Sequence, residues 1–213
     1  MDGTVAPTGA TRLWKENPLS DNPCSFTLED LDKCACALLV IDECGPAKDL
    51  DPRLESMVEH TAKLCASART AGVPVIFACD AHIPGLDREL LLWGNHGLAG
   101  TPSCLPTPAL GFAEGDYYIA KRRYSAFFQT GLRLLLEELG VSTLIVAGFD
   151  TNICVRHTLA DAYFNNYDSV VVTDATATFL VGTQENGLHE IEICYGSLLA
   201  STDEVCAFLA AGE

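Results

Sequence analysis

A cysteine stands where this chain could best support nucleophilic chemistry. An apolar run at 142–147 predicts a buried strand, and a helical pattern follows it at 152–166. The sequence therefore places Cys154 in the first turn of a helix, just beyond the end of a strand. Unpaired backbone N–H groups and the positive helix end favour a thiolate there, and the same groups could bind an oxyanion. The competing interpretation is a cysteine buried as an inert part of the core.

Two charged residues could complete a catalytic group around this cysteine. A thiol needs a base to become a good nucleophile, and Asp42, at the end of an apolar run, could accept its proton. A carboxylate and a thiolate side by side would repel each other, so a cation should lie near both. Lys121 ends another short strand pattern and could supply that charge. Taken singly, a strand-end Asp is more often a turn residue, and a lysine is usually solvated.

A second candidate site is a set of metal ligands. In the run DAH at 80–82, the first and third side chains point to the same side of an extended segment. The run WGNH at 93–96 adds a second imidazole. One carboxylate and two imidazoles, from Asp80, His82 and His96, suit zinc, with iron or manganese as alternatives. The competing interpretation is that each histidine is an ordinary loop residue.

The elements that must position these residues alternate along the chain. Strands are predicted at 37–42, 73–80, 117–121, 143–148, 169–175 and 197–200, and helices at 54–71, 130–139, 152–166, 184–195 and 202–210. Apolar strands separated by helices indicate a parallel sheet covered on both faces. The expected fold is therefore α/β, a three-layer α-β-α sandwich with a mainly parallel sheet of about six strands. Ligands of such sheets bind at the carboxyl ends of the strands, and the polar residues at those ends are Asp42, Asp80, Lys121, Asp150 with Cys154, and Asp174.

The rest of the organisation is simple. Residues 1–33 are rich in Pro, Asp, Asn and Thr and are predicted to form an N-terminal arm. Residues 34–213 are predicted to form one domain. The long irregular stretch 81–115 is expected to be functional, because compact domains seldom carry such loops otherwise.

Composition narrows the class of protein. The formal net charge of −16 disfavours nucleic acids and anionic membranes as partners, and 48% hydrophobic residues indicate a globular protein. We see no signal-peptide pattern and no apolar run near the ~20 residues that a membrane span needs. A cytoplasmic protein is therefore expected, with its ten cysteines mostly as free thiols.

These motifs together resemble the isochorismatase-like cysteine hydrolases, the superfamily that includes nicotinamidases. The matching residues are Leu38 to Asp42, Lys121 with Tyr124-Ser125-Ala126-Phe127, Gly148 to Val155, Thr158, Asp161-Ala162, Val170 to Ala175 and Val205. The resemblance covers roughly residues 36–210. It implies that Asp42, Lys121 and Cys154 form a catalytic triad. It also implies a cis peptide before Asp150 and an oxyanion hole made by the backbone N–H groups of Asp150 and Cys154.

The resemblance also bears on the metal and the pocket. Nicotinamidases carry a DxH and a later WPxH that bind a metal, so Asp80, His82 and His96 are the implied ligands. Trp93, Tyr124 and Phe127 are candidates for the pocket lining. The family's DxQxDF-like run is replaced here by DECGPA at 42–47, which predicts a different or more open pocket.

The expected activity is hydrolysis of a small amide through a thioester, as in nicotinamidases. Two alternatives stay open: a different small amide or a vinyl ether as substrate, or a catalytically silent scaffold. The family commonly forms homo-oligomers, so a dimer or tetramer is expected.

Overall fold

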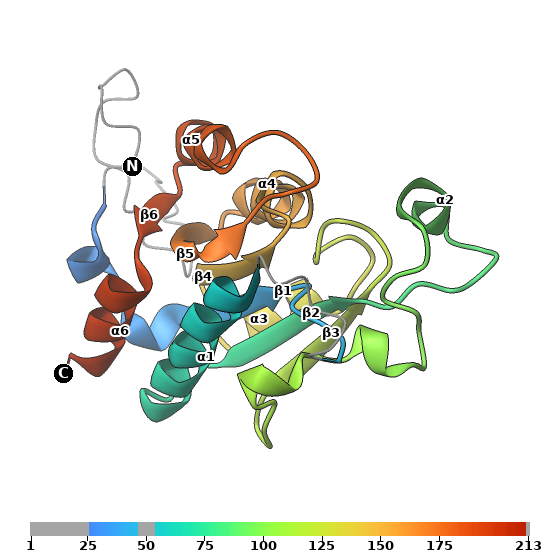
Figure 1. Ribbon diagram of the computed structural model, residues 1–213. Helices are drawn as coiled ribbons and strands as arrows, with labels where there is room; N and C mark the ends of the chain where they lie inside the picture. Colours follow the sequence, from blue (N-terminus) through green and yellow to red (C-terminus); the bar gives the residue numbers. More distant parts are fainter. Residues whose placement is uncertain (1–25, 47–53, 212–213) are drawn as a thin grey trace, which may run out of the picture.

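The computed structural model describes residues 26–46 and 54–211, and these form an α/β fold around one sheet (Figure 1). All neighbouring strands are parallel, in the order β3-β2-β1-β4-β5-β6. The strands are β1 (Cys36–Ile41), β2 (Val75–Asp80), β3 (Tyr117–Lys121), β4 (Thr143–Phe149), β5 (Asp168–Ala177) and β6 (Leu198–Ala200). The helices are α1 (Glu55–Thr70), α2 (Glu89–Trp93), α3 (Leu132–Glu138), α4 (Arg156–Phe164), α5 (Gln184–Tyr195) and α6 (Thr202–Ala210). The predicted six-stranded parallel sheet is confirmed.

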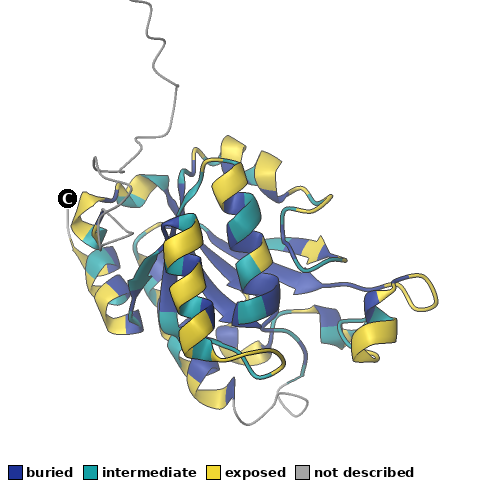
Figure 2. Cartoon of the chain, turned by 90° about the horizontal axis from the view of Figure 1, so that it is seen from above, coloured by how far each residue is buried: buried dark blue, intermediate teal, exposed yellow. Residues whose placement is uncertain are grey.

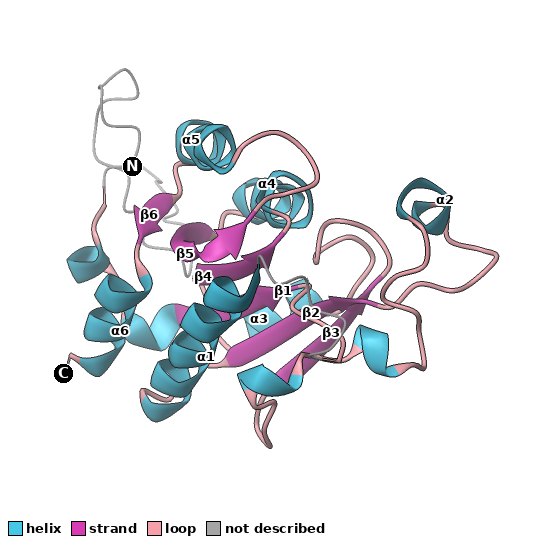
Figure 3. Cartoon of the chain, viewed as in Figure 1, coloured by secondary structure: helices cyan, strands magenta, loops and turns pink. Residues whose placement is uncertain are grey.

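Helices cover both faces of the sheet, which gives the predicted three layers (Figure 3). Side chains of β1 alternate between two cores because successive residues of a strand point to opposite faces. Leu38 and Val40 belong to the core that includes side chains of α1 and α6. Leu39 and Ile41 belong to the core that includes side chains of α3, α4 and α5. β1 and β2 are buried along their whole length, and the middle of the sheet is dark blue in Figure 2, since both of its faces are covered.

Two local structures differ from the sequence prediction. The predicted helix at 152–166 begins with a π-helical turn, Thr151–Val155, and continues as α4. The stretch 81–115 is not wholly irregular, because it contains α2 and the short 3-10 turns Pro102–Cys104 and Pro108–Leu110. Hydrophobic periodicity in the sequence could not reveal these elements, because each is shorter than the window of about 11–18 residues in which a helical pattern is recognised.

The predicted N-terminal arm is described only from residue 26 onward. Phe26 and Leu31 are buried in the same core as α1 and α6. Lys33 Nζ donates a hydrogen bond to the carbonyl oxygen of Ala211 at 2.8 Å, near the end of α6. This part of the arm therefore packs on the domain, whereas the rest lies outside the described residues. No helix in the described ranges is long and apolar enough to cross a membrane.

The strand order creates a switch point between β1 and β4, where chain connections leave in opposite directions. Such a point is where open α/β sheets bind ligands. Gly148 lies here with φ +118°, and a Cβ on it would stand 2.0 Å from the carbonyl oxygen of Ile41. Only glycine fits, because both the backbone conformation and the close approach of β1 exclude a side chain.

Glu43 offers a stability prediction that is separate from any chemistry. Its side chain is buried, and Oε1 accepts a hydrogen bond from Thr61 Oγ1 at 2.7 Å. Burial raises the pKa of Glu43 from 4.5 to about 8, against the opposing effect of the Thr61 hydrogen bond. Unfolded chains lose this proton near pH 4.5, whereas the folded protein keeps it until about pH 8. The stability that this group contributes is therefore full below pH 4.5 and declines as the pH rises toward 8.

Glu43→Gln, which is neutral at every pH, is expected to remove that decline. Its free energy of unfolding at pH 8 should exceed that of the wild type by on the order of 3 kcal/mol, with little difference at pH 4. Urea denaturation at both pH values measures this. Glu137→Gln, which changes an exposed acid paired with Arg133, is the control. Equal pH dependence in wild type and Glu43→Gln would contradict the assignment.

Candidate active site

The carboxyl ends of three strands and the turn after a fourth converge on Lys121. Its Nζ lies 2.7 Å from Asp42 Oδ2, 2.6 Å from Asp80 Oδ1 and 3.6 Å from Cys154 Sγ. Lys121 is fully buried, and the other three residues are at most 8% exposed. The structure thus brings together the three residues expected to form a triad, and it adds Asp80 to them.

The strands themselves fix this arrangement. Asp80 and Lys121 are register partners at the ends of β2 and β3. Asp42 follows β1 with φ 56°, a left-handed conformation that Asp tolerates better than most residues. Its Oδ1 accepts a hydrogen bond from the N–H of Asp80 at 2.9 Å, which leaves Oδ2 for the ammonium group. Side chains held by backbone of neighbouring strands are rigid, as a catalytic group requires.

The charges of this cluster depend on one another. Burial acts against the ammonium form of Lys121, but Asp42, Cys154 and Asp80 raise its pKa well above the ordinary range. Burial and the charge of Asp80 raise the pKa of Asp42 to about 7, although Lys121 opposes them. Burial, followed by the charge of Asp42, also raises the pKa of the Cys154 thiol, against Lys121. This raised pKa runs against the expectation that the helix start favours a resting thiolate, because burial and the charge of Asp42 both favour the neutral thiol.

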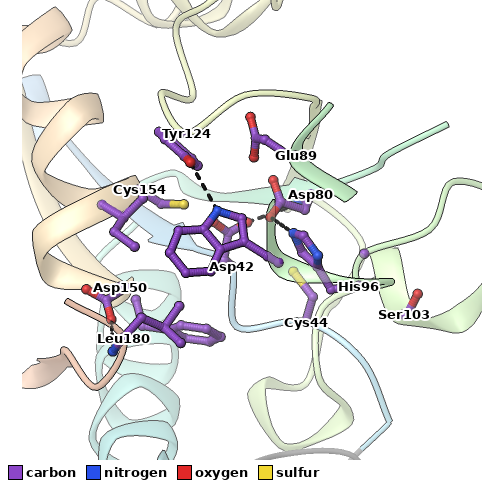
Figure 4. A pocket seen from close by; sticks show the side chains of 14 residues that line it. Asp42, Cys44, Asp80, Glu89, His96, Ser103, Tyr124, Asp150, Cys154 and Leu180 are labelled. Atoms are coloured by element: carbon purple, nitrogen blue, oxygen red, sulfur yellow. Dashed lines mark hydrogen bonds and ion pairs between the residues drawn. The ribbon is translucent and has the colours of Figure 1, made fainter. Parts of the chain in front are cut away.

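A cavity of about 280 Å³ opens beside this cluster (Figure 4). Its lining residues are Asp42, Cys44, Asp80, Glu89, Trp93, His96, Gly97, Ser103, Tyr124, Phe149, Asp150, Ile153, Cys154 and Leu180. Trp93 and Tyr124 are both among them, and the Trp93 indole N–H donates to Tyr124 Oη at 3.0 Å. Phe127 is not among them. Its ring packs instead on Tyr167 at 5.7 Å between centroids, in the core beneath α3 and α4.

The three expected metal ligands lie together, and two of them, Asp80 and His96, line the cavity. Asp80 Oδ1 is 3.5 Å from His82 Nε2, and Asp80 Oδ2 is 3.6 Å from His96 Nε2. One ligand atom from each residue lies within 4.8 Å of the others. The imidazole of His82 is fully buried, and neither of its nitrogens has a hydrogen-bond partner among the described residues. A buried, unsatisfied imidazole beside a carboxylate and a second imidazole fits a divalent metal.

Sequence reasoning missed two acids beside these ligands. Glu89 Oε2 lies 3.6 Å from His82 Nε2 and faces the cavity from α2. Asp87 Oδ2 lies 3.7 Å from His82 Nδ1, and Arg122 Nη2 donates to Asp87 Oδ1 at 2.6 Å. The only signal was their place within the irregular stretch after Asp80, where the sequence holds several charged residues. Glu89 therefore borders the group of expected ligands, and Asp87 lies beside the other nitrogen of the His82 ring.

The turn after β4 presents the cysteine to the cavity. The peptide between Phe149 and Asp150 is cis, as expected from the resemblance. Asp150 and Cys154 both line the cavity. Val155 N–H donates to the carbonyl oxygen of Asp150 at 3.2 Å, which closes the wide π-helical turn. The two residues whose backbone N–H groups are expected to hold an oxyanion thus both border the cavity.

Other residues of the YSAF run and of α4 hold this arrangement from outside. Thr158 Oγ1 donates to the carbonyl oxygen of Cys154 at 2.7 Å and accepts from the N–H of Ala126 at 3.0 Å. Ser125 Oγ donates to Asp161 Oδ2 at 2.5 Å. These contacts tie the loop that follows Lys121 to the helix that follows Cys154, so these residues of the motif have a supporting role.

Comparisons with known proteins agree with this geometry. The sequence model of the Isochorismatase domain matches residues 36–203. Ureidoacrylate amidohydrolase RutB of Methylorubrum extorquens is 30% identical over 182 residues, which are 73% of this chain and 69% of that protein. The crystal structure of N-carbamoylsarcosine amidase from Thermoplasma acidophilum is 31% identical with a TM-score of 0.72, covering 79% of this chain and 96% of its own. The structure of pyrazinamidase/nicotinamidase from Streptococcus mutans is 27% identical with a TM-score of 0.71, covering 78% and 99%.

Proposed function

Because the chain belongs to the Isochorismatase domain family, we propose that it is a cysteine-dependent hydrolase of a small amide. The substrate carries its C–N bond in a carboxamide or in an N-carbamoyl group, the two kinds of compound named for its relatives. One observation carries the proposal: a fully buried ammonium group contacts both an acid and a cysteine that face one cavity.

The first half of the reaction forms a thioester. Asp42 takes the proton of Cys154 as the sulfur attacks the carbonyl carbon, which suits a thiol whose pKa is raised at rest. Lys121 stabilises the negative charge that the carboxylate and the sulfur share during this step. The backbone N–H groups of Asp150 and Cys154 bind the oxyanion of the tetrahedral intermediate, and each such donor contributes about 3 kcal/mol.

The second half releases the products. Asp42 gives its proton to the departing amine or ammonia, and the C–N bond breaks to leave the acyl group on Cys154. A water molecule then attacks the thioester while Asp42 accepts its proton. The carboxylic or carbamic acid leaves, and the thiol regains a proton.

Asp80, His82 and His96 would hold a divalent metal, zinc by preference and iron or manganese as alternatives, with Glu89 beside them. Such an ion supplies a Lewis-acidic contact that orients a polar atom of the substrate. Two of these residues, Asp80 and His96, line the same cavity as Cys154. We therefore assign these residues to substrate orientation, and the nucleophile to Cys154.

A metal prediction follows from the burial of His82. His82→Asn is expected to weaken zinc binding by at least ~100-fold, since one of three strong ligands is lost. Isothermal titration calorimetry of chelator-treated protein measures this. His189→Asn, which changes a histidine of α5 that does not line the cavity, should bind as the wild type does. Equal affinity of His82→Asn and the wild type would contradict the ligand assignment.

The substrate class can be tested with a small panel. Nicotinamide, pyrazinamide, N-carbamoylsarcosine and ureidoacrylate would be incubated with the purified, zinc-supplemented protein, and released ammonia measured. Turnover of at least one of these amides is expected. Isochorismate is included because a vinyl ether has no amide carbonyl, and its loss is followed by chromatography because its hydrolysis releases no ammonia. Turnover of isochorismate alone would contradict the proposal, and no turnover of any compound would favour a catalytically silent protein.

A further inference from the structure

The side chain of Asp150 makes hydrogen bonds that are not needed for oxyanion binding by its backbone. The residue is buried, and its carboxylate is satisfied by four neutral donors. Oδ1 accepts hydrogen bonds from the N–H of Asn152 at 2.9 Å and from Thr178 Oγ1 at 2.6 Å. Oδ2 accepts from the N–H groups of Phe179 at 3.0 Å and Leu180 at 3.1 Å. Three of the four donors thus belong to one segment, distant in sequence.

That segment forms a wall of the cavity. Residues 178–183 connect β5 to α5, and Leu180 lines the cavity together with Cys154. Figure 4 shows Leu180 beside Asp150, on the side of the cavity away from the expected metal ligands. Asn152 Nδ2 adds hydrogen bonds to Thr178 Oγ1 at 3.2 Å and to the carbonyl oxygen of Thr183 at 3.3 Å. The connection is therefore attached to the turn that carries the nucleophile.

The chemistry of an ionised acceptor explains why an acid stands here. Hydrogen bonds to a charged acceptor are about twice as strong as those between neutral groups. A carboxylate offers two oxygens with about four acceptor sites, which matches the four donors present. From residue 150 an oxyanion hole needs only the backbone N–H group, which any residue other than proline would supply. The carboxylate is thus available to hold residues 178–180.

We propose that Asp150 is a positioning residue that fixes Leu180 over the cavity, and that Leu180 limits the size of the group that reaches Cys154. This deepens the proposed function, on which it rests in taking Cys154 as the reacting sulfur. Bulky acyl groups would meet the Leu180 side chain, whereas small carboxamides and carbamoyl groups would pass.

Hydrogen exchange tests the first half of the inference without any substrate. In Asp150→Asn an NH2 group, which donates hydrogen bonds, replaces one carboxylate oxygen, which accepted them. The side chain therefore cannot bind all four donors. Backbone amides of Phe179 and Leu180 are expected to exchange at least about tenfold faster than in the wild type. Asp174→Asn is the matched control. Asp174 Oδ1 accepts from Thr202 N–H and Oγ1 at 2.8 Å each, at the start of α6.

Thiol labelling tests the second half. The rates at which iodoacetamide and the bulkier N-phenylmaleimide label Cys154 are measured by mass spectrometry of its peptide. Asp150→Asn and Leu180→Ala should both raise the ratio of bulky to small labelling by about tenfold, whereas Asp174→Asn should leave it unchanged. Leu180→Ala should keep the wild-type exchange rate at Phe179, since the Asp150 carboxylate and the backbone N–H groups that donate to it remain.

Each outcome has one meaning. Unchanged exchange at 179–180 in folded Asp150→Asn, or unchanged labelling ratios in both variants, would overturn the inference. If Asp150→Asn does not fold, Thr178→Val removes one donor and should give a smaller rise in exchange. A wild-type protein that hydrolyses none of the amides in the panel would count against the proposed function instead, while the exchange result would still decide the role of Asp150.

Discussion

Cys154→Ala is expected to lower kcat/KM for the amide that the wild type hydrolyses by about 10⁴-fold or more, because the thioester cannot form without the sulfur. The fold should survive. The change removes one sulfur atom from a residue that is 8% exposed and borders an existing cavity. Ammonia release and circular dichroism, measured on the same preparation, check both statements.

Cys44→Ala is the matched control for this variant. Cys44 also lines the cavity, yet it forms no contact with Lys121. Its removal should therefore change activity far less than that of Cys154. Full activity in folded Cys154→Ala would refute a covalent mechanism, and an equal loss in both variants would mean that cavity shape matters more than the sulfur at position 154.

Lys121→Met is expected to lower both stability and activity. The variant keeps the length of the side chain but removes the ammonium group, which leaves the carboxylates of Asp42 and Asp80 buried without their shared partner. Breaking a buried ion pair from one side typically costs about 3–5 kcal/mol. Activity should fall with stability, because the charge that accompanies proton transfer to Asp42 is lost. Urea denaturation of chelator-treated protein and ammonia release measure the two effects.

Two further variants provide a surface control and a test of charge compensation. Arg133→Met removes one partner of an exposed pair with Glu137, where side chains are 63% and 54% exposed, and should cost no more than ~0.5 kcal/mol. The double variant Asp42→Asn with Lys121→Met removes opposite charges together, so it should regain part of the lost stability while staying inactive. A Lys121→Met protein as stable as Arg133→Met would contradict the charge cluster seen around Lys121.

The roles of Asp42, Lys121 and Cys154 rest on geometry and family membership, and the experiments above decide them. The boundary between an arm at 1–33 and a domain at 34–213, the homo-oligomer and the cytoplasmic location also remain predictions. Size-exclusion chromatography with light scattering would determine whether the protein is a dimer or tetramer.

The sequence predicted the strands and most of the helices because these depend on local periodicity. A buried strand such as β1 is apolar throughout, and the long helix α1 is followed by the stop signal Gly72. Residues at the ends of parallel strands share one edge of the sheet, so Asp42 and Lys121 could be paired with Cys154 before any coordinates. Candidate catalytic residues at the ends of strands can therefore be predicted from the sequence.

Side-chain direction and burial were decided by the tertiary structure alone. Phe127 stands three residues from Tyr124 and both pack against the same core, yet only Tyr124 also lines the cavity. Glu89 and the carboxylate of Asp150 gained their surroundings from segments that only long-range packing brings near. The raised pKa of the Cys154 thiol has the same origin, since desolvation depends on every atom that excludes water from the sulfur. No local pattern in the chain encodes that sum.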